Sequence, residues 1–352
     1  MQKLLPAFLV STACTGVAMA QPSVTIYGTL DINIRSVKAD GLSRSVSEAG
    51  GSLNSSVFGL RGAEDLGGGL SAGFNLEGDV SVDTGVTGAG SKFWNRRSTL
   101  SLVDNRLGEL RLGRDYIPTF WTQGIFDAFG IVGLGASANV RQLFGGVRMD
   151  NSVGYFLPSN LGGLFGQAMV AASEGGTALD RPGRHLGGRV GYAAGPLNVA
   201  VAYARQNFGA AFAAGTNGAS AVTTASPGAH QNTFNVGASW DFGVVKLMAY
   251  YDRETLNDLR ENMRSVSASI PLGPAQFKLG YDRSELKATT TTTVEQFKAS
   301  YVYSLSKRTA LYSTVSHLTN RGGSRLTLAG AEGPTSANGS STGLEFGIRH
   351  FF

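Results

Sequence analysis

Several short segments of the chain carry an arginine or a carboxylate between apolar neighbours. Arg61 follows Leu60, and Arg111 lies between Leu110 and Leu112. If the apolar residues of a segment share one face of a strand, the charged side chain points to the other face. Charges around a narrow opening with low-dielectric walls focus the electric field and change the local ion concentration. The pattern therefore predicts selection between ions rather than catalysis.

The same parity argument gives further inward-facing candidates, namely Glu77, Arg97 and Glu109. Two unit charges about 5 Å apart interact by roughly 3 kcal/mol at an effective dielectric constant near 20. A few unpaired arginines would thus favour anions. We expect Glu77, together with Asp127 of a later loop, to subtract from that preference.

The residues that usually carry catalysis or bind metals form no recognisable motif. The four histidines have neither metal-ligand spacing nor a Gly-x-Ser-x-Gly segment nearby; they are His185, His230, His317 and His350. The glycine run 67–69 predicts a turn rather than a phosphate-binding loop, because no helical pattern follows it. We predict no enzymatic activity, no metal and no cofactor.

The first twenty residues predict a signal peptide. Lys3 is their only charge, residues 4–17 are apolar, and the small residues 18–20 suit cleavage after position 20. A membrane anchor is disfavoured because about 14 apolar residues are too few to span a bilayer. A lipoprotein role for Cys14 lacks the leucine that usually precedes such a cysteine. We expect residues 21–352 to form a single domain without cysteine.

Composition narrows the class of protein. Glycine accounts for 49 of 352 residues, roughly twice its average share. Mean hydropathy is −0.01, and no run of 18 apolar residues predicts a helical membrane span. Removing Lys3 from the 30 basic residues leaves 29 against 25 acidic residues, a net charge of +4. Because the basic residues are scattered, nucleic acid is not an expected partner.

Short segments with period-two alternation predict strands. Seven short turns separate them, at 65–69, 104–108, 159–163, 194–196, 241–243, 271–274 and 305–307. Eight longer polar connections lie between, near 38–54, 81–93, 117–147, 174–184, 207–230, 256–260, 287–293 and 321–340. Fifteen connections imply sixteen strands. Alternating short and long connections are typical of outer-membrane barrels, whereas a soluble sandwich or lectin would not require them.

The last strand is predicted to reach the end of the chain. From Leu344 onward every second residue is apolar or aromatic except His350, and the final residue is Phe352. An open sheet edge in lipid leaves backbone groups unpaired at a cost of several kcal/mol each. This pattern favours an all-β, 16-stranded antiparallel transmembrane barrel whose last strand closes it.

Seven segments carry specific motifs, namely Ser23–Asp31, Phe58–Leu70, Asn95–Leu102, Gly108–Asp115, Asp150–Tyr155, Leu305–Tyr312 and Gly347–Phe352. They resemble the Gram-negative general porin family of betaproteobacteria and Neisseria, and most closely its anion-selective member from comamonads. The likeness as a whole extends over essentially all of the chain after residue 20. The resemblance implies homotrimers of 16-stranded barrels, each with its third loop folded inward as a constriction. It also implies passage of solutes by diffusion.

The resemblance implies pore-facing roles for Arg96 and Arg148, and its motif includes Arg114. Strand alternation, in contrast, points Arg97 and not Arg96 toward the inner face. A bulge at the start of that strand could reconcile the two arguments, so both arginines remain candidates. A third basic position of the anion-selective member falls on Val57. That departure predicts a weaker anion preference.

Residues 117–147 contain only two charges, Asp127 and Arg141, among several glycines and aromatic residues. A loop this long without structure of its own is usually functional. We interpret it as a segment packed inside the barrel. An outer flap and a trimer contact are the alternatives.

Taken together, the sequence predicts a general diffusion porin in the outer membrane of a Gram-negative bacterium, with a preference for small anions. A substrate-specific channel for organic acids or phosphate is the alternative, and a non-conducting structural barrel is a third class. Expected partners are two further copies of the chain, outer-membrane lipid with lipopolysaccharide, and the barrel-insertion machinery, for which Phe352 is the expected signal.

Overall fold

The computed structural model describes residues 23–88, 92–143, 145–173, 183–207 and 229–352. The predicted signal peptide, Phe144 of the third loop and most of the loops at 174–184 and 207–230 lie outside these residues. Among the described residues, no helix is long and apolar enough to cross a membrane.

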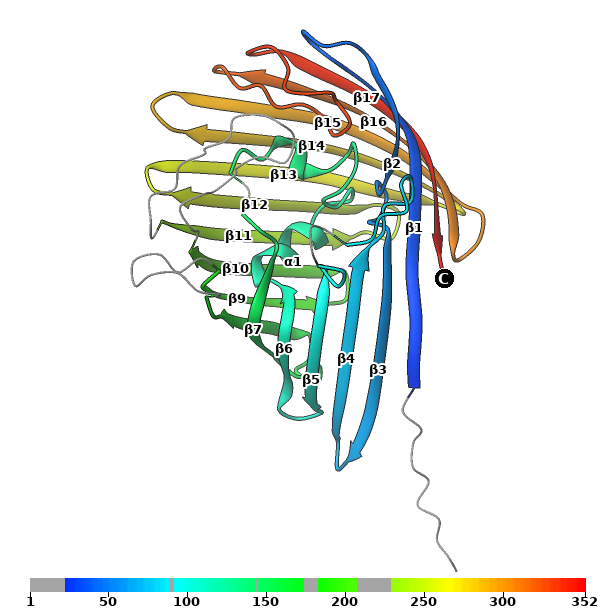
Figure 1. Cartoon of the computed structure of the whole chain (residues 1–352), viewed down its shortest axis with the longest axis vertical. Helices are drawn as coiled ribbons and strands as arrows, with labels where there is room; N and C mark the ends of the chain where they lie inside the picture. Colours follow the sequence, from blue (N-terminus) through cyan, green and yellow to red (C-terminus); the bar gives the residue numbers. More distant parts are fainter. Residues whose placement is uncertain (1–22, 89–91, 144, 174–182, 208–228) are drawn as a thin grey trace, which may run out of the picture.

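One closed antiparallel sheet forms the molecule (Figure 1). Its wall strands are β1 (Ser23–Ala39), β3 (Val57–Gly67), β4 (Leu70–Asp79), β5 (Arg97–Asp104), β6 (Gly108–Tyr116), β7 (Arg148–Phe156), β8 (Leu164–Ala171), β9 (His185–Ala194), β10 (Leu197–Asn207), β11 (His230–Asp241), β12 (Lys246–Leu256), β13 (Leu259–Leu272), β14 (Ala275–Lys287), β15 (Thr291–Ser304), β16 (Thr309–Arg321) and β17 (Ser340–Phe351). Each pairs with its neighbours along the chain, and β1 pairs with both β17 and β3. The predicted sixteen-stranded barrel is confirmed.

Alternation places apolar side chains outside and polar ones inside. On β1, Val24, Ile26 and Ile34 are more than half exposed, whereas Asp31 and Arg35 are buried. An outer face of this kind suits lipid, and a polar interior suits water. Asp31 and Arg35 therefore lie on the inner face of the barrel.

The second barrel strand is divided in two. β2 (Ser45–Gly50) and β3 lie beside the upper and lower parts of β1. Between them the Asp31 carboxylate accepts backbone N–H bonds from Ser52 at 3.3 Å and Asn54 at 2.7 Å. These bonds hold the intervening segment against the inner wall.

Two predicted long connections are in fact tight. Only residues 257–258 join β12 to β13, and only residues 288–290 join β14 to β15. The polar residues placed there belong to the strands, because β13 to β16 extend for 13 or 14 residues. The strand count is unaffected.

The segment between β6 and β7 contains α1 (Pro118–Ile125) and the 3-10 helix η1 (Ser137–Val140). Proline at the first helical turn needs no hydrogen-bond partner for its nitrogen, which suits the start of α1. Helix α1 contacts β8 to β11, and η1 contacts β14 and β15. Figure 1 shows α1 surrounded by the wall strands.

Candidate functional site

Three arginines gather around one tyrosine on the inner side of β4 to β7. Tyr116 is the last residue of β6, Arg148 is the first of β7 and Arg97 is the first of β5, with Arg96 directly before it. The guanidinium carbons of Arg96, Arg97 and Arg148 lie 5.9, 5.6 and 4.4 Å from the ring centroid of Tyr116. Arg148 Nη2 also donates a hydrogen bond of 2.9 Å to the Tyr116 hydroxyl. We call these four residues the Tyr116 cluster.

Carboxylates neutralise two of the three arginines. Arg96 pairs with Glu77 at 2.8 Å and with Asp79 at 2.7 Å, and Arg97 pairs with Asp115 at 2.9 Å. In the described part of the chain, Arg148 makes no ion pair. Arg148 is therefore the arginine of the cluster that lacks a carboxylate partner among the described residues, and its guanidinium is held over an aromatic face that favours cations.

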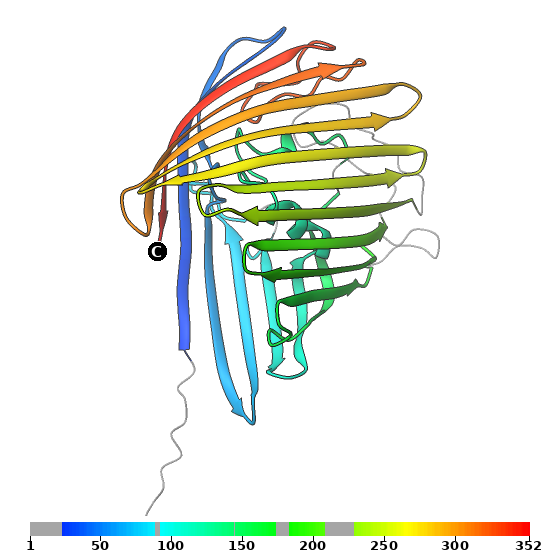
Figure 2. The same ribbon diagram turned by 180° about the vertical axis from the view of Figure 1, so that it is seen from behind.

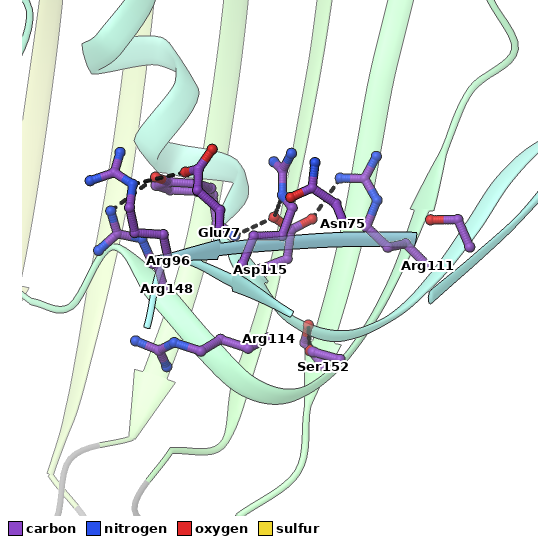
Figure 3. A network of polar contacts seen from close by, with 12 residues as sticks. Asn75, Glu77, Arg96, Arg111, Arg114, Asp115, Arg148 and Ser152 are labelled. Carbon is purple, nitrogen blue, oxygen red and sulfur yellow. Dashed lines mark hydrogen bonds and ion pairs between the residues drawn. The ribbon is translucent and has the colours of Figure 1, made fainter. Parts of the chain in front are cut away.

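Both Arg96 and Arg97 reach the cluster, although adjacent strand residues normally point to opposite faces. Arg97 is paired across the sheet with Glu77, as inward parity predicts. Arg96 precedes the first residue of β5, and its backbone N–H still bonds the Glu77 carbonyl at 3.0 Å. Because Arg96 lies outside the strand, it is free of strand parity. Figure 3 shows Arg96 and Arg148 beside Glu77.

A second group of charges continues along β3 to β6. Arg111 pairs with Glu109 at 2.7 Å and with Asp115 at 2.6 Å. Arg61 is exposed, makes no ion pair among the described residues, and lies 5.1 Å above the ring of Tyr27. Arg61, Arg97, Glu109 and Arg111 line one cavity of about 350 Å³.

Arg114 does not join the Tyr116 cluster. The pairing of β6 with β7 shifts between Gly113 and Asp115, which marks a bulge at Arg114. The side chain instead pairs with Asp150 at 2.7 Å and bonds the Asn95 carbonyl at 2.6 Å. Figure 3 shows it set apart from Glu77 and Asp115. Arg114 therefore lies outside the cluster, and its role as a pore charge stays a prediction.

Both charged residues of the segment 117–147, Asp127 and Arg141, form buried ion pairs with the barrel wall. Lys298 bonds both Asp127 and Asp282 at 2.8 Å, and all three side chains are fully buried. Arg141 pairs with Asp252 at 3.1 Å and with Glu254. Asp127 is thus fully buried and shares the Lys298 cation with Asp282, so it does not lie free opposite the arginines as the sequence led us to expect.

Backbone groups of this segment are also fixed to the wall. Glu261 accepts the N–H groups of Gln142 at 2.8 Å and Leu143 at 2.6 Å. Gln296 donates to the Leu134 carbonyl at 2.8 Å, and Ser267 accepts the Ala128 N–H at 3.0 Å. The attachments are therefore spread over β13 and β15.

Glycines of the wall leave room for three apolar side chains of the segment. A β-carbon at Gly237 would lie 2.2 Å from the Phe126 ring, and one at Gly343 would lie 2.6 Å from Leu134. A β-carbon at Gly280 would lie 3.1 Å from Phe129. The sequence reasoning did not single out these glycines. Strand alternation places these glycines on the inner face, and this position could have indicated them, since an inward glycine permits close approach of another group.

Opposite Arg96, the segment borders an open space. A cavity of about 310 Å³ is lined by Val57, Glu77 and Arg96 on the wall side and by Trp121 and Phe129 on the loop side. Val57 thus faces the interior at the position where the resemblance has a basic residue. Among the described residues, no group of histidine, cysteine or carboxylate side chains could hold a metal ion.

Comparison with known proteins gives consistent matches. The profile of a family described as Gram-negative porin matches residues 7–323. Outer membrane porin protein 32 of Delftia acidovorans is 37% identical, with all of both chains covered. The solved anion-selective porin from Comamonas acidovorans is 34% identical with a TM-score of 0.80, covering 94% of this chain and all of that one. A trimer form of OmpT from Vibrio cholerae, 15% identical with a TM-score of 0.68 over 94% and 99% of the two chains, shares the fold.

Proposed function

Since the chain belongs to the Gram-negative porin family, we propose that it is a general diffusion porin that passes small hydrophilic solutes and favours anions. Membership in the family confirms the resemblance predicted from the sequence, and it identifies an outer-membrane protein. The observation that carries the anion preference is the Arg148 guanidinium over Tyr116, which forms no ion pair with any described residue.

The segment 117–147 is proposed to narrow the pore. Its buried ion pairs with Lys298 and with the acids around Arg141 support this role, because they hold it against β12 to β15. The opening would then lie between the segment and the wall of β3 to β7. Arg148 and Arg61 would be its uncompensated charges.

The preference expected from this arrangement is modest. The five arginines Arg61, Arg96, Arg97, Arg111 and Arg148 face four acids, Glu77, Asp79, Glu109 and Asp115, which leaves a difference of one positive charge. Val57 adds no charge. In a narrow low-dielectric opening, even one such charge changes the local ion concentration.

Reversal potentials of single channels in a tenfold KCl gradient would test the proposal. We expect anion selectivity that weakens as the salt is raised, because the Debye length shrinks from about 10 Å at 0.1 M to about 3 Å at 1 M. A cation-selective channel would overturn the anion preference. Flux of an organic acid or phosphate that saturates would favour the substrate-specific alternative.

A homotrimer is proposed from the family resemblance, with the loop between β4 and β5 reaching over a neighbouring barrel. Unheated protein should migrate in SDS gels well above the monomer, and heating should collapse it. A monomer in mild detergent by light scattering would count against this assembly.

A further inference from the structure

A cavity of about 470 Å³ lies inside the barrel, at the end that carries the short turns. Its wall side includes Pro271 and Pro274, at the turn between β13 and β14, and Arg349 near the end of β17. Figure 2 shows the end of β17 beside the turn between β15 and β16, at this same end of the molecule. The other side of the cavity is formed by residues 127–130 of the inner segment. The cavity is therefore enclosed between that segment and the wall.

Two cations line this cavity without a carboxylate partner. Lys278 of β14 and Arg349 form no ion pair with any described residue. Arg349 is held by other contacts, since its Nη1 donates to Asn54 Oδ1 at 3.2 Å and its guanidinium carbon lies 4.1 Å from the ring centroid of Phe351. In the described structure the buried Nε of Arg349 has no hydrogen-bond partner. The guanidinium is thus fixed in place with a donor to spare.

The acids nearest to these cations are already bonded elsewhere. Asp127 also lines the cavity, but its carboxylate is fully buried and bonded to Lys298. Asp31 is the cross-strand neighbour of Arg349, and it is buried as well. Its carboxylate accepts hydrogen bonds from backbone N–H groups of residues 52–54 and from a tyrosine hydroxyl. Lys278 and Arg349 are therefore available to an anion that enters the cavity.

Much of the remaining wall is apolar. The apolar residues are Leu53, Phe129, Pro271, Pro274 and Val302. The ring of Phe129 is buried and lies 4.8 Å from Lys298 Nζ, so it forms a fixed flat surface. Sites for small molecules are typically cavities of about 300–1,000 Å³ that combine apolar walls with a few placed polar groups. This cavity suits a ligand with one acidic group and an apolar ring.

The cavity adjoins the proposed opening of the pore. It shares Phe129 and Gly130 with the space opposite Arg96, so a solute that passes there reaches it. We propose that Lys278 and Arg349 bind the carboxylate of a small aromatic acid, whose ring lies against the apolar wall. The proposal rests on the proposed diffusion pore for access, and the site is distinct from the Tyr116 cluster.

The chemistry of the two parts of the site determines the ligand. A guanidinium binds a carboxylate through paired hydrogen bonds. Burial of an apolar ring adds binding free energy that a bare inorganic anion cannot gain. The cavity should therefore prefer an aromatic carboxylate over both a small aliphatic one and inorganic phosphate.

Binding is measured by isothermal titration calorimetry on the unaltered protein in detergent. Benzoate is the probe, and acetate is the carboxylate without a ring. We expect benzoate to bind at least tenfold more tightly than acetate. Equal binding of the two, or no binding of benzoate, would overturn the proposal. So would displacement of benzoate by equimolar inorganic phosphate, because it would indicate a site for any anion.

Two double variants with the same loss of charge locate the site. Lys278→Gln with Arg349→Gln should bind benzoate at least tenfold more weakly. The control is Arg189→Gln with Lys246→Gln, which removes one arginine and one lysine from the inner faces of β9 and β12, outside the cavity. It should change benzoate binding less than twofold, and it corrects for benzoate taken up by the detergent. Equal binding by the two variants would overturn the proposal.

Heat-sensitive migration in SDS gels first shows that both variants are folded; if one is not, the comparison of benzoate with acetate decides alone. Single-channel recordings separate this proposal from the proposed function. Anion-selective conductance without preferential benzoate binding would overturn only the binding site. Benzoate binding by a protein that does not conduct, or that selects cations, would overturn only the proposed function.

Discussion

Arg148 donates a hydrogen bond of 2.9 Å to the hydroxyl of Tyr116 and places its guanidinium 4.4 Å above that ring. The same ring has Arg96 and Arg97 nearby, but both of those are neutralised by carboxylates. Within the described structure, Tyr116 therefore positions a guanidinium that has no ion pair, and it does so without cancelling the positive charge. A carboxylate in place of the tyrosine would hold the arginine equally well and abolish its field.

Replacing Arg148 should weaken or reverse the ion preference. In Arg148→Glu the local charge changes by two, which exceeds the difference of one positive charge estimated for the pore. We expect reversal potentials in a tenfold KCl gradient to shift toward cation selectivity, by several-fold in permeability ratio. Arg148→Glu combined with Arg96→Glu should shift them further.

Arg114→Gln supplies the control, because Arg114 lies apart from the Tyr116 cluster and pairs with Asp150. Its reversal potential should stay close to that of the unaltered protein. An equal shift in Arg114→Gln, or none in Arg148→Glu, would mean that selectivity arises elsewhere.

A second prediction concerns the ion pairs that Lys298 forms with Asp127 and Asp282. Lys298→Met would leave Asp127 and Asp282 buried without their cation, and removing one partner of a buried pair typically costs about 3–5 kcal/mol. Release of the segment 117–147 from the wall would relieve part of this cost. We expect noisier channels with altered conductance and a lower unfolding temperature.

Lys298→Met combined with Asp127→Asn and Asp282→Asn should recover part of the lost stability, because no uncompensated carboxylate remains. Thermal unfolding and single-channel recordings of both variants provide the measurement. A Lys298→Met channel with normal conductance and stability would show that this ion pair does not hold the segment.

The sequence predicted the barrel because lipid on one side and water on the other force a period-two pattern on every strand. It did not predict which charges remain unpaired. Parity counting cannot detect the bulge that separates Arg114 from the cluster. It also cannot identify Lys298 as the partner of Asp127, since 171 residues separate the two in the chain. Such pairings depend on the path of the inner segment, which local patterns do not encode.

Gly237 tests the packing of that segment. In Gly237→Ala the added methyl group would lie 2.2 Å from the Phe126 ring, and overpacking of this kind typically costs about 1–3 kcal/mol. Displacement of Phe126 should change single-channel conductance and lower the unfolding temperature. Gly188→Ala is the matched control, because its β-carbon would make only an ordinary contact at 3.5 Å.

Adding Phe126→Leu to Gly237→Ala should restore part of the stability, since the smaller side chain leaves room for the methyl group. If Gly237→Ala behaves like Gly188→Ala in both measurements, the close approach does not constrain the segment.

The last residue closes the barrel against the first strand. Gly28 donates a backbone hydrogen bond to the Phe352 carbonyl at 3.2 Å, and Phe352 donates to the Gly28 carbonyl at 3.1 Å. A β-carbon at Gly28 would lie 2.3 Å from the Phe352 ring, so the ring fits against the glycine.

Deleting Phe352 removes both bonds and this contact, and leaves the edge of β1 unpaired at that point. In lipid, each unsatisfied backbone group costs several kcal/mol. We expect secretion to remain intact while folded, heat-modifiable protein in the outer-membrane fraction falls strongly. Phe352→Tyr, which keeps the backbone and the ring, should insert almost normally. Normal levels of folded protein after the deletion would show that neither the terminal pairing nor a terminal signal governs assembly.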